Sequence, residues 1–179
     1  MQKVSKAEPL WDGSSNMNPA GLSFWSLVRE DFVTHDRDMF SQGFFALFVH
    51  RFGNWRMSVK YKVLRMPFSL LYHVLAKVVQ VFCGIKLDYT VLVGRRVKLE
   101  HFGGMILGAR RIGDDVVIGS GAQIIGPIQI GKYARIAANA VVVKNVPESA
   151  TMVGIPAKAV RLENKGKFRP YGVDDKVKD

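Results

Sequence analysis

The sequence predicts a mainly β fold, a parallel β-solenoid over residues 87–160 that follows an α-helical region. An aliphatic residue recurs every six positions, at Leu87, Val93, Leu99, Ile112, Ile118, Ile124, Ile130, Ile136 and Val142. A small or β-branched residue stands four places after most of them. A period of six fits neither a helix nor an alternating strand, but it fits three short sides per coil stacked as parallel strands. At about 18 residues per coil, the stretch gives roughly four coils.

Glycine directly follows four of the leading aliphatic residues, at Gly94, Gly113, Gly119 and Gly131. We expect these glycines to form sharp corners that require a positive φ. The repeat breaks once, because thirteen positions instead of twelve separate Leu99 from Ile112. The sequence there reads His101-Phe102-Gly103-Gly104. An interruption of a regular pattern predicts a functional site.

Three helices are expected before the repeat, at residues 22–35, 43–55 and 63–83. Ser23 is placed to cap the first of them, and the second is aromatic enough to require a packing partner. The third approaches the length of a membrane span. It carries one apolar stripe, which consists of Leu64, Phe68, Leu71, Leu75, Val78 and Phe82. Polar residues lie opposite that stripe, so an amphipathic helix is predicted and not a spanning one.

Positive charge dominates the chain, with 26 Lys and Arg against 15 Asp and Glu, a formal net charge of +11. Such a charge suits an anionic partner, whether nucleic acid, an acidic membrane surface or a polyanion such as coenzyme A. No acidic residue lies between Asp38 and Asp88. The helical region therefore covers the first coil, the interpretation we favour, or contacts an anionic membrane as a peripheral partner. Nucleic acid is not expected, because no recognition motif accompanies the charge.

Four segments are expected: a flexible lead at 1–21, an α-helical region at 22–86, the repeat domain at 87–160 and a charged, mobile tail at 161–179. The lead lacks the long apolar run of a signal peptide. The single Cys83 lies in an apolar segment, which predicts a buried thiol in a reducing compartment. These features favour a cytoplasmic protein, at the inner face of the membrane if the helices bind lipid. No metal cluster is expected.

The repeats, followed by the segments 139–142 and 153–158, resemble the left-handed β-helix acyltransferases. Three segments are more specific: Glu30-Asp31 through Thr34-His35-Asp36, the stretch 43–47 that leads to 50–55, and Glu100-His101-Phe102-Gly103-Gly104. They resemble the serine acetyltransferase branch of that superfamily, especially short members found with polysaccharide biosynthesis. The resemblance implies a left-handed solenoid, a homotrimer and acetyl-CoA as co-substrate.

His101 is the candidate catalytic base. Transfer of an acetyl group from a thioester to a hydroxyl needs a base for the hydroxyl proton, and neutral imidazole suits that role near pH 7. A structural histidine stacked in the solenoid is the alternative. In the family a carboxylate one coil earlier orients this histidine, but the matching position here is Lys86. Asp88, Asp36 or Asp31 could supply the carboxylate, whereas Glu100 would point to the opposite side of a strand.

The resemblance also implies binding residues. Ser120, Ala138 and Asn139 match positions along the pantetheine arm of coenzyme A, and Gly154, Lys158 and Arg161 would approach its nucleotide end. Asp31 and Asp36 belong to the region that helps bind the acceptor. The serine enzymes carry an extra coil and a loop after the histidine, which this chain lacks. Arg110 and Arg111 are the candidate anion contacts in their place.

The function expected from these observations is acetyl-CoA-dependent O-acetylation of serine or of a sugar hydroxyl in surface-polysaccharide biosynthesis. The alternative is a catalytically inactive trimeric solenoid that acts as a scaffold or a membrane-adjacent assembly protein.

Overall fold

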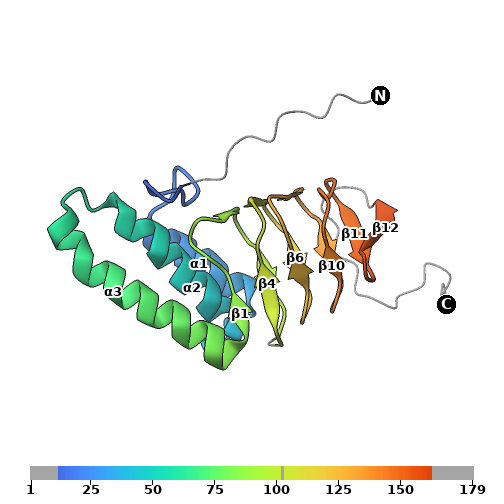
Figure 1. Ribbon diagram of the computed structural model, residues 1–179, viewed down its shortest axis with the longest axis horizontal. Coiled ribbons are helices and arrows are strands. Elements are labelled where there is room, and N and C mark those ends of the chain that lie inside the picture. Colours follow the sequence, from blue (N-terminus) through green and yellow to red (C-terminus); the bar gives the residue numbers. More distant parts are fainter. Residues whose placement is uncertain (1–11, 102, 163–179) are drawn as a thin grey trace.

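A computed structural model describes residues 12–101 and 103–162, in which a layer of helices leads into a β-solenoid (Figure 1). The helices are α1 (Phe24–Thr34), α2 (Gln42–Trp55) and α3 (Lys62–Val78). A 3-10 turn, η1 (Arg56–Ser58), follows α2, and a π-helical turn, η2 (Val79–Cys83), extends α3. Ser23 caps α1 as predicted, because its side chain accepts a hydrogen bond from the Ser26 amide. The solenoid with preceding helices confirms the predicted fold class.

Twelve short strands form the solenoid. They are β1 (Ile85–Lys86), β2 (Leu92–Val93), β3 (Lys98–Leu99), β4 (Met105–Leu107), β5 (Arg111–Ile112), β6 (Val117–Ile118), β7 (Gln123–Ile124), β8 (Gln129–Ile130), β9 (Arg135–Ile136), β10 (Val141–Val142), β11 (Ala150–Val153) and β12 (Lys158–Leu162). Three parallel sheets result, ordered β1-β4-β7-β10, β2-β5-β8 and β3-β6-β9-β11, and β12 joins the last in antiparallel fashion. Each of the first three coils contributes one strand to every sheet.

The interior is filled by the residues that the six-residue period predicts. Their side chains are at most 3% exposed, from Val93 and Leu99 through Val142. Leu87 is the exception and is half-buried. It lies in the first coil, with a neighbouring coil on one side only, and Ile85 two residues earlier takes the interior position at 1% exposure.

The break in the repeat hides one more interior residue, Leu107, which is 1% exposed. It pairs with Ile124 in the next coil. The spacing is therefore eight residues from Leu99 to Leu107 and five from Leu107 to Ile112. Two residues are inserted at the corner that contains His101, and the following side is one residue short. Neither spacing is six, so the period alone missed this position.

The corner glycines correct a prediction. None of Gly94, Gly113, Gly119 and Gly131 appears among the described residues with a positive φ. Close stacking explains them instead, because a Cβ on each would collide with the backbone of the next coil. At Gly119 the added atom would lie 2.6 Å from the Ala138 amide nitrogen, and at Gly131 it would lie 2.5 Å from the Glu148 nitrogen.

Replacing Gly131 with alanine is expected to lower the free energy of unfolding by about 1–3 kcal/mol, because the backbone of the last coil must shift to admit a methyl group. Urea unfolding followed by circular dichroism measures the change. The exposed Lys144, changed to alanine, is the control and should stay within about 0.5 kcal/mol of the parent. An equal effect of the two substitutions would contradict the stacking explanation.

The first coil is covered by polar side chains of α2. Asn54 Nδ2 donates to the Tyr89 carbonyl at 2.8 Å, and His50 Nε2 donates to the Val91 carbonyl at 2.9 Å. Arg51 donates to the carbonyls of Val93 and Gly94 at 2.8 and 2.6 Å. Within residues 12–101 and 103–162 no coil precedes this one to donate to these carbonyls, and buried carbonyls need a partner. The resembling segment 50–55 is thus the cap of the solenoid.

Residues 12–21 differ from the expected flexible lead. The Asn18 side chain donates to the Arg51 carbonyl at 3.0 Å, and the Met17 amide donates to Asn54 Oδ1 at 3.2 Å. These bonds hold the segment against α2. The rest of the predicted lead, residues 1–11, and the tail beyond residue 162 lie outside the described residues.

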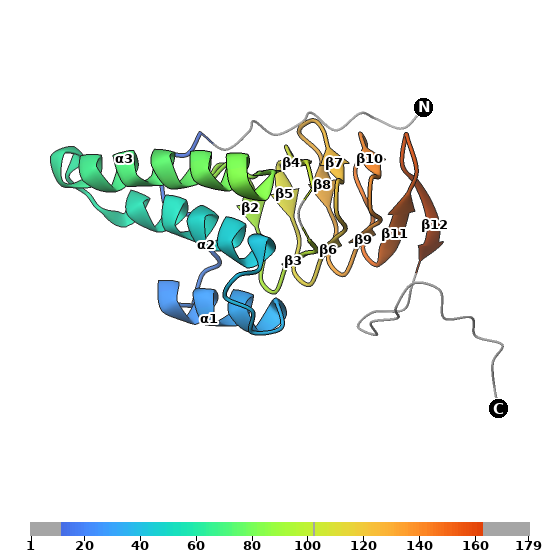
Figure 2. The same ribbon diagram turned by 90° about the horizontal axis from the view of Figure 1, so that it is seen from below.

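Helix α3 packs on α2 through a face that the sequence did not predict. Tyr72 and Val79 are buried, whereas Leu64 and Phe82 of the predicted apolar stripe are 60% and 77% exposed. The Tyr72 ring sits where Gly53 leaves room, since a Cβ on Gly53 would lie 2.5 Å from it. Figure 2 shows α3 as the outer layer, beside α2 and away from α1. Cys83 is a buried free thiol, as expected.

Candidate active site

One edge of the solenoid brings five of the predicted site residues together. We call it the His101 edge. It consists of the turns at 100–101 with 103–104, at 119–122 and at 137–140, which connect the β3-β6-β9 sheet to the β4-β7-β10 sheet coil by coil. The turn at 154–157, which joins β11 to β12, continues the edge because its Gly154 carbonyl accepts from the Val141 amide. The His101 edge contains His101, Ser120, Ala138, Asn139 and Gly154. These residues are far apart in the sequence, and the stacking of coils aligns them along one line.

Contacts between coils fix this alignment. The Asn139 amide donates to the Ser120 carbonyl at 2.8 Å, and the Val141 amide donates to the Gly154 carbonyl at 3.1 Å. A Cβ on Gly103 would lie 3.0 Å from Ser120 Oγ, so the turn after His101 rests on the next coil. Small side chains line the edge, which leaves its backbone open to a ligand.

His101 is exposed and has a φ of 56°. In regular corners the positive φ falls three residues after the interior aliphatic, as at Asp115 (57°) and Asn139 (57°). His101 is only two residues after Leu99, so the positive φ falls one residue earlier here than in the regular corners. The insertion therefore gives this corner a different backbone conformation. An exposed imidazole on a distinct corner is accessible to a substrate.

Sequence reasoning missed Gln123, which supports this corner. Its Nε2 donates to the Gly104 carbonyl and, at 3.2 Å, to the Gly121 carbonyl. Gln123 therefore joins the turn after His101 to the next coil. Its signal was available, because it is a polar residue directly before an interior aliphatic and beside a glycine-rich corner.

Asp36 lies close in the fold to the strand that leads to His101. Its carboxylate pairs with Lys98 Nζ at 2.8 Å, and Lys98 is 3.8 Å from Glu100. The hydrogen bond from Lys98 lowers the pKa of the Asp36 carboxyl. Next to it, His35 Nε2 accepts from the Leu99 amide at 3.2 Å. The turn after α1 is thus held against β3, the strand that leads directly into the corner with the candidate base.

Asp31 corrects the prediction of an acceptor contact. Its side chain is 1% exposed and pairs with Arg51 at 2.9 Å. Burial raises the pKa of this carboxyl, and the charge of Arg51 opposes that rise. A carboxylate enclosed in this way cannot reach a substrate or His101, so Asp31 belongs to the cap of the first coil.

Asp88, Arg110 and Arg111 also lie away from His101 within one chain. They occupy the edge between the β1-β4 and β2-β5 strands, whereas His101 lies between β3 and β4. The expected pairing of Asp88 with His101 is therefore not made by this chain's fold. Each coil has three sides and three corners, so a residue's position in the repeat decides the corner at which it lies. Asp88 and Arg110 lie at the corner before the β2-β5-β8 sheet, and Arg111 is the first residue of β5.

The end of the solenoid carries the remaining predicted residues. Lys158 is exposed and starts β12, where it pairs with Val153 beside the turn that contains Gly154. The backbone of Arg161 lies opposite Thr151 in the same hairpin. Both residues thus follow the last turn of the His101 edge.

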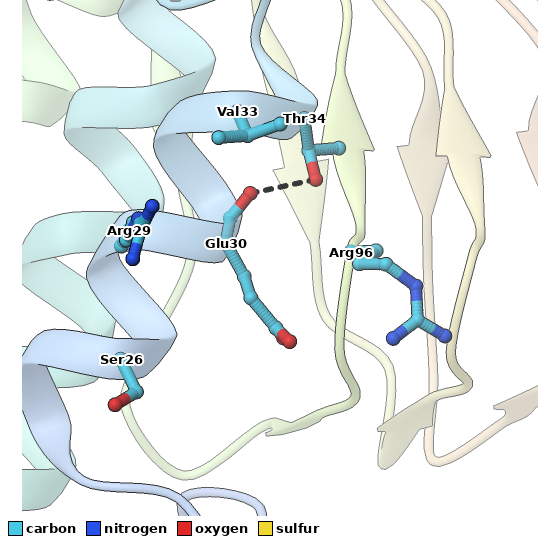
Figure 3. Close-up of a pocket in the computed structure, with 6 residues that line it drawn as sticks. All are labelled: Ser26, Arg29, Glu30, Val33, Thr34 and Arg96. Carbon is cyan, nitrogen blue, oxygen red and sulfur yellow. Dashed lines mark hydrogen bonds between the residues drawn. The ribbon is translucent and has the colours of Figure 1, made fainter.

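A separate cavity of about 370 Å³ lies between α1 and the corner after β2 (Figure 3). It is lined by Ser26, Arg29, Glu30, Val33, Thr34 and Arg96. The ion pair between Glu30 and Arg95 connects α1 to the solenoid at this cavity, and Arg96 pairs with Asp115 of the next coil at 2.7 Å. This corner is not part of the His101 edge, so the cavity is not assigned to the same site.

Two further histidines serve the fold. Burial lowers the pKa of His35, and it lowers that of His50 to about 3. Nε2 of His50 is protonated and donates a hydrogen bond to the Val91 carbonyl. Nδ1 has no hydrogen-bond partner within the described part of the chain. A second proton would therefore be both buried and unpaired, so His50 is neutral.

Acidification is therefore expected to destabilise the protein. The folded pKa of His50 is below its ordinary value of 6.5, so its contribution is complete above that value and is lost as the pH falls further. Between neutrality and about pH 5 the loss from His50 alone is about 2 kcal/mol. Urea unfolding at several pH values measures it. His50→Gln should show a shallower pH dependence than the parent, and an unchanged slope would contradict the assignment.

Comparisons with known proteins agree with this fold. The family described as bacterial transferase hexapeptide (six repeats) matches residues 111–144. The serine acetyltransferase of Mycobacterium tuberculosis is 30% identical over 156 residues, which cover 72% of this chain and 65% of that protein. The Bacillus subtilis serine acetyltransferase is 25% identical over 177 residues, 82% of this chain and 81% of the relative.

Solved structures give the same result. Neisseria gonorrhoeae serine acetyltransferase matches with a TM-score of 0.61 and 25% identity, over 82% of this chain and 70% of that chain. A serine acetyltransferase in complex with CoA matches with a TM-score of 0.57 and 26% identity, over 77% and 70%. The fold and the repeats are similar to those of the hexapeptide-repeat transferases. Within that class, the matches support the serine acetyltransferase-like branch, which is the branch that the sequence resembles.

Proposed function

We propose that the protein is an acetyl-CoA-dependent O-acetyltransferase in which His101 is the general base. The observation that carries the proposal is the His101 edge, where an exposed imidazole stands in line with Ser120, Ala138 and Asn139. The acceptor is a hydroxyl of serine or of a sugar in surface-polysaccharide biosynthesis. The names of the relatives favour serine.

The chemistry requires one proton transfer at the acceptor. Neutral His101 removes the hydroxyl proton as the oxygen attacks the thioester carbonyl. A carbon–oxygen bond forms, the carbon–sulfur bond breaks, and the proton held by the imidazole neutralises the leaving thiolate. Asp36 and Glu100 both pair with Lys98 of β3, so they are the carboxylates nearest in the described ion pairs to the corner with His101.

Coenzyme A would extend along the His101 edge. The small residues Ser120 and Ala138 leave backbone groups open to the pantetheine amides. Lys158, with Arg161 in the same strand, would supply positive charge for the phosphates at the end of the solenoid. The structural match to a serine acetyltransferase in complex with CoA supports this placement.

The acceptor region distinguishes this chain from the serine enzymes that it resembles. Only residues 108–110 join β4 to β5, so no extended loop follows the corner with His101. The acceptor contacts that such a loop would make must come from other elements, and this difference is our reason to include sugar hydroxyls.

A homotrimer is part of the proposal. Three aliphatic side chains on one flank of the solenoid, Ile106, Ile125 and Val143, are 44%, 51% and 46% exposed. Stacked coils align Ile125 and Val143 one above the other. An exposed aliphatic stripe on a regular flank suits contact with a neighbouring subunit, and a subunit groove is where the resemblance places coenzyme A.

The test is release of free thiol from acetyl-CoA, measured with serine and with a panel of nucleotide sugars and glycans. Acceptor-dependent release supports the proposal and identifies the acceptor. No release with any acceptor, together with weak acetyl-CoA binding, would favour the inactive scaffold.

A further inference from the structure

The outer surface of α3 is apolar to a degree that the fold does not explain. Its exposed aliphatic and aromatic side chains, which we call the outer α3 face, range from 48% to 78% exposed and consist of Val63, Leu64, Leu70, Leu71, Val74, Val81 and Phe82. The helix lies at the outer border of the molecule in both ribbon views (Figures 1 and 2). Contiguous apolar surface of this kind marks a contact site.

Length and composition point to lipid. The helical stretch Lys62–Cys83 has the length and hydropathy of a membrane span, with a mean hydropathy of 1.4, yet only 17% of it is buried. A core helix of a soluble protein would be mostly buried. Burial in a protein core therefore does not explain why this helix is so apolar.

The helix is nevertheless fastened to the protein along one side. Tyr72 is buried against α2, its hydroxyl accepts a hydrogen bond from the Tyr89 amide at 3.2 Å, and the Arg56 guanidinium stacks on its ring at 4.5 Å. A spanning helix is surrounded by lipid or by other spanning elements, and this one would have to leave α2. The arrangement fits a helix that lies in the plane of the membrane surface.

Charge complementarity selects an anionic surface. At about 100° per residue the outer α3 face forms one broad arc, and Lys62, His73, Lys77 and Gln80 form a polar strip along one border of it. Lys60, Lys62, Lys77 and Lys86 are exposed, and no acidic residue lies between Asp38 and Asp88. Lysines beside an apolar arc reach the headgroups of anionic lipids.

A second copy fits this surface less well. Two outer α3 faces packed together would bring two lysine strips toward each other, and the segment 39–87 has no carboxylate to neutralise them. Like charges at such a contact oppose association. Anionic headgroups remove this repulsion.

We propose that the protein binds anionic membrane surfaces through the outer α3 face, with α3 lying in the membrane plane and its lysines at the headgroups. This proposal goes beyond the acetyltransferase function and does not depend on it.

The test is co-sedimentation of the full chain with vesicles of phosphatidylcholine alone and with added phosphatidylglycerol, at low and high salt. We expect binding to the anionic vesicles that weakens as salt rises. Val63→Gln with Leu70→Gln and Val74→Gln should weaken binding by about tenfold or more. Lys60→Gln with Lys62→Gln and Lys77→Gln should weaken binding and reduce its salt dependence.

The matched control is Met39→Gln with Phe40→Gln, because these side chains are 71% and 93% exposed outside α3. This variant should bind as the parent does. Absence of binding to anionic vesicles, or equal binding by the apolar variant, would overturn the proposal. A lower assembly mass of the apolar variant in light scattering would also overturn it, in favour of a second copy on this face.

Discussion

Replacing His101 with alanine is expected to lower acetyl-CoA-dependent turnover by about a hundredfold to ten-thousandfold, the range for loss of a general base. The side chain is exposed and makes no described contact that stabilises the fold, so the free energy of unfolding should change little. The measurement is acceptor-dependent thiol release, with urea unfolding in parallel. A catalytic base predicts that activity falls and stability does not.

Two controls make this prediction specific. His73→Ala changes another exposed histidine, on α3 and away from the His101 edge, and should retain the parent's turnover. Gln123→Ala removes a positioning residue, so it should lower turnover less than His101→Ala while leaving the pH profile of the reaction in place. Turnover that survives in His101→Ala would remove the imidazole from the mechanism and shift the search to the Asp36 side of the corner.

Replacing Arg51 with alanine is expected to lower the free energy of unfolding by about 3–5 kcal/mol, the cost of leaving one partner of a buried ion pair alone. Arg51 is 0% exposed, and its substitution would leave Asp31 uncompensated in the interior. It would also leave the carbonyls of Val93 and Gly94 without their donor. Urea unfolding measures the loss, and the exposed Arg29→Ala should stay within about 0.5 kcal/mol of the parent.

A double-mutant cycle separates the ion pair from the cap. If the pair is the main contribution, Arg51→Met with Asp31→Leu should recover part of the stability that either single change loses, because no charge is left buried. The two carbonyls of the first coil remain unsatisfied in the double variant, so recovery should be incomplete. Strictly additive losses would argue against coupling between Asp31 and Arg51.

The interior of the solenoid was largely predictable, because stacking of coils depends on a residue's place in the repeat. Val93, Leu99 and the aliphatics from Ile112 to Val142 are buried as the period predicts. Leu107 was missed because the two residues inserted before it and the one residue missing after it nearly offset each other. The distance from Leu99 to Ile112 is therefore only one residue longer than two regular repeats. The corner glycines were identified correctly but explained wrongly, since collisions between coils depend on neighbours that the local sequence does not show.

The candidate site also contains residues whose position followed from the repeat and residues whose position did not. His101, Ser120, Ala138, Asn139 and Gly154 were selected one by one from the sequence, and the coils align them on a single edge. Asp88, Arg110 and Arg111 were selected for their chemistry, and the three-sided coil places them at another corner. Asp31 was selected through the resemblance as an acceptor contact, but it is buried against Arg51, which lies twenty residues away on α2.

The sequence by itself determined the class of fold and most of the interior residues of the solenoid, because these depend on the local period. The bounds of the solenoid were less exact, since β1 begins at Ile85 and β12 ends at Leu162, outside the predicted 87–160. Only the tertiary structure decided which charges are buried, which side of α3 faces outward and which corner each polar residue occupies. All three depend on which elements pack together, and such contacts join residues that are far apart in the sequence. The apolar stripe of α3 has the same period whether it faces α2 or solvent, and packing of Tyr72 over Gly53 settles which it is.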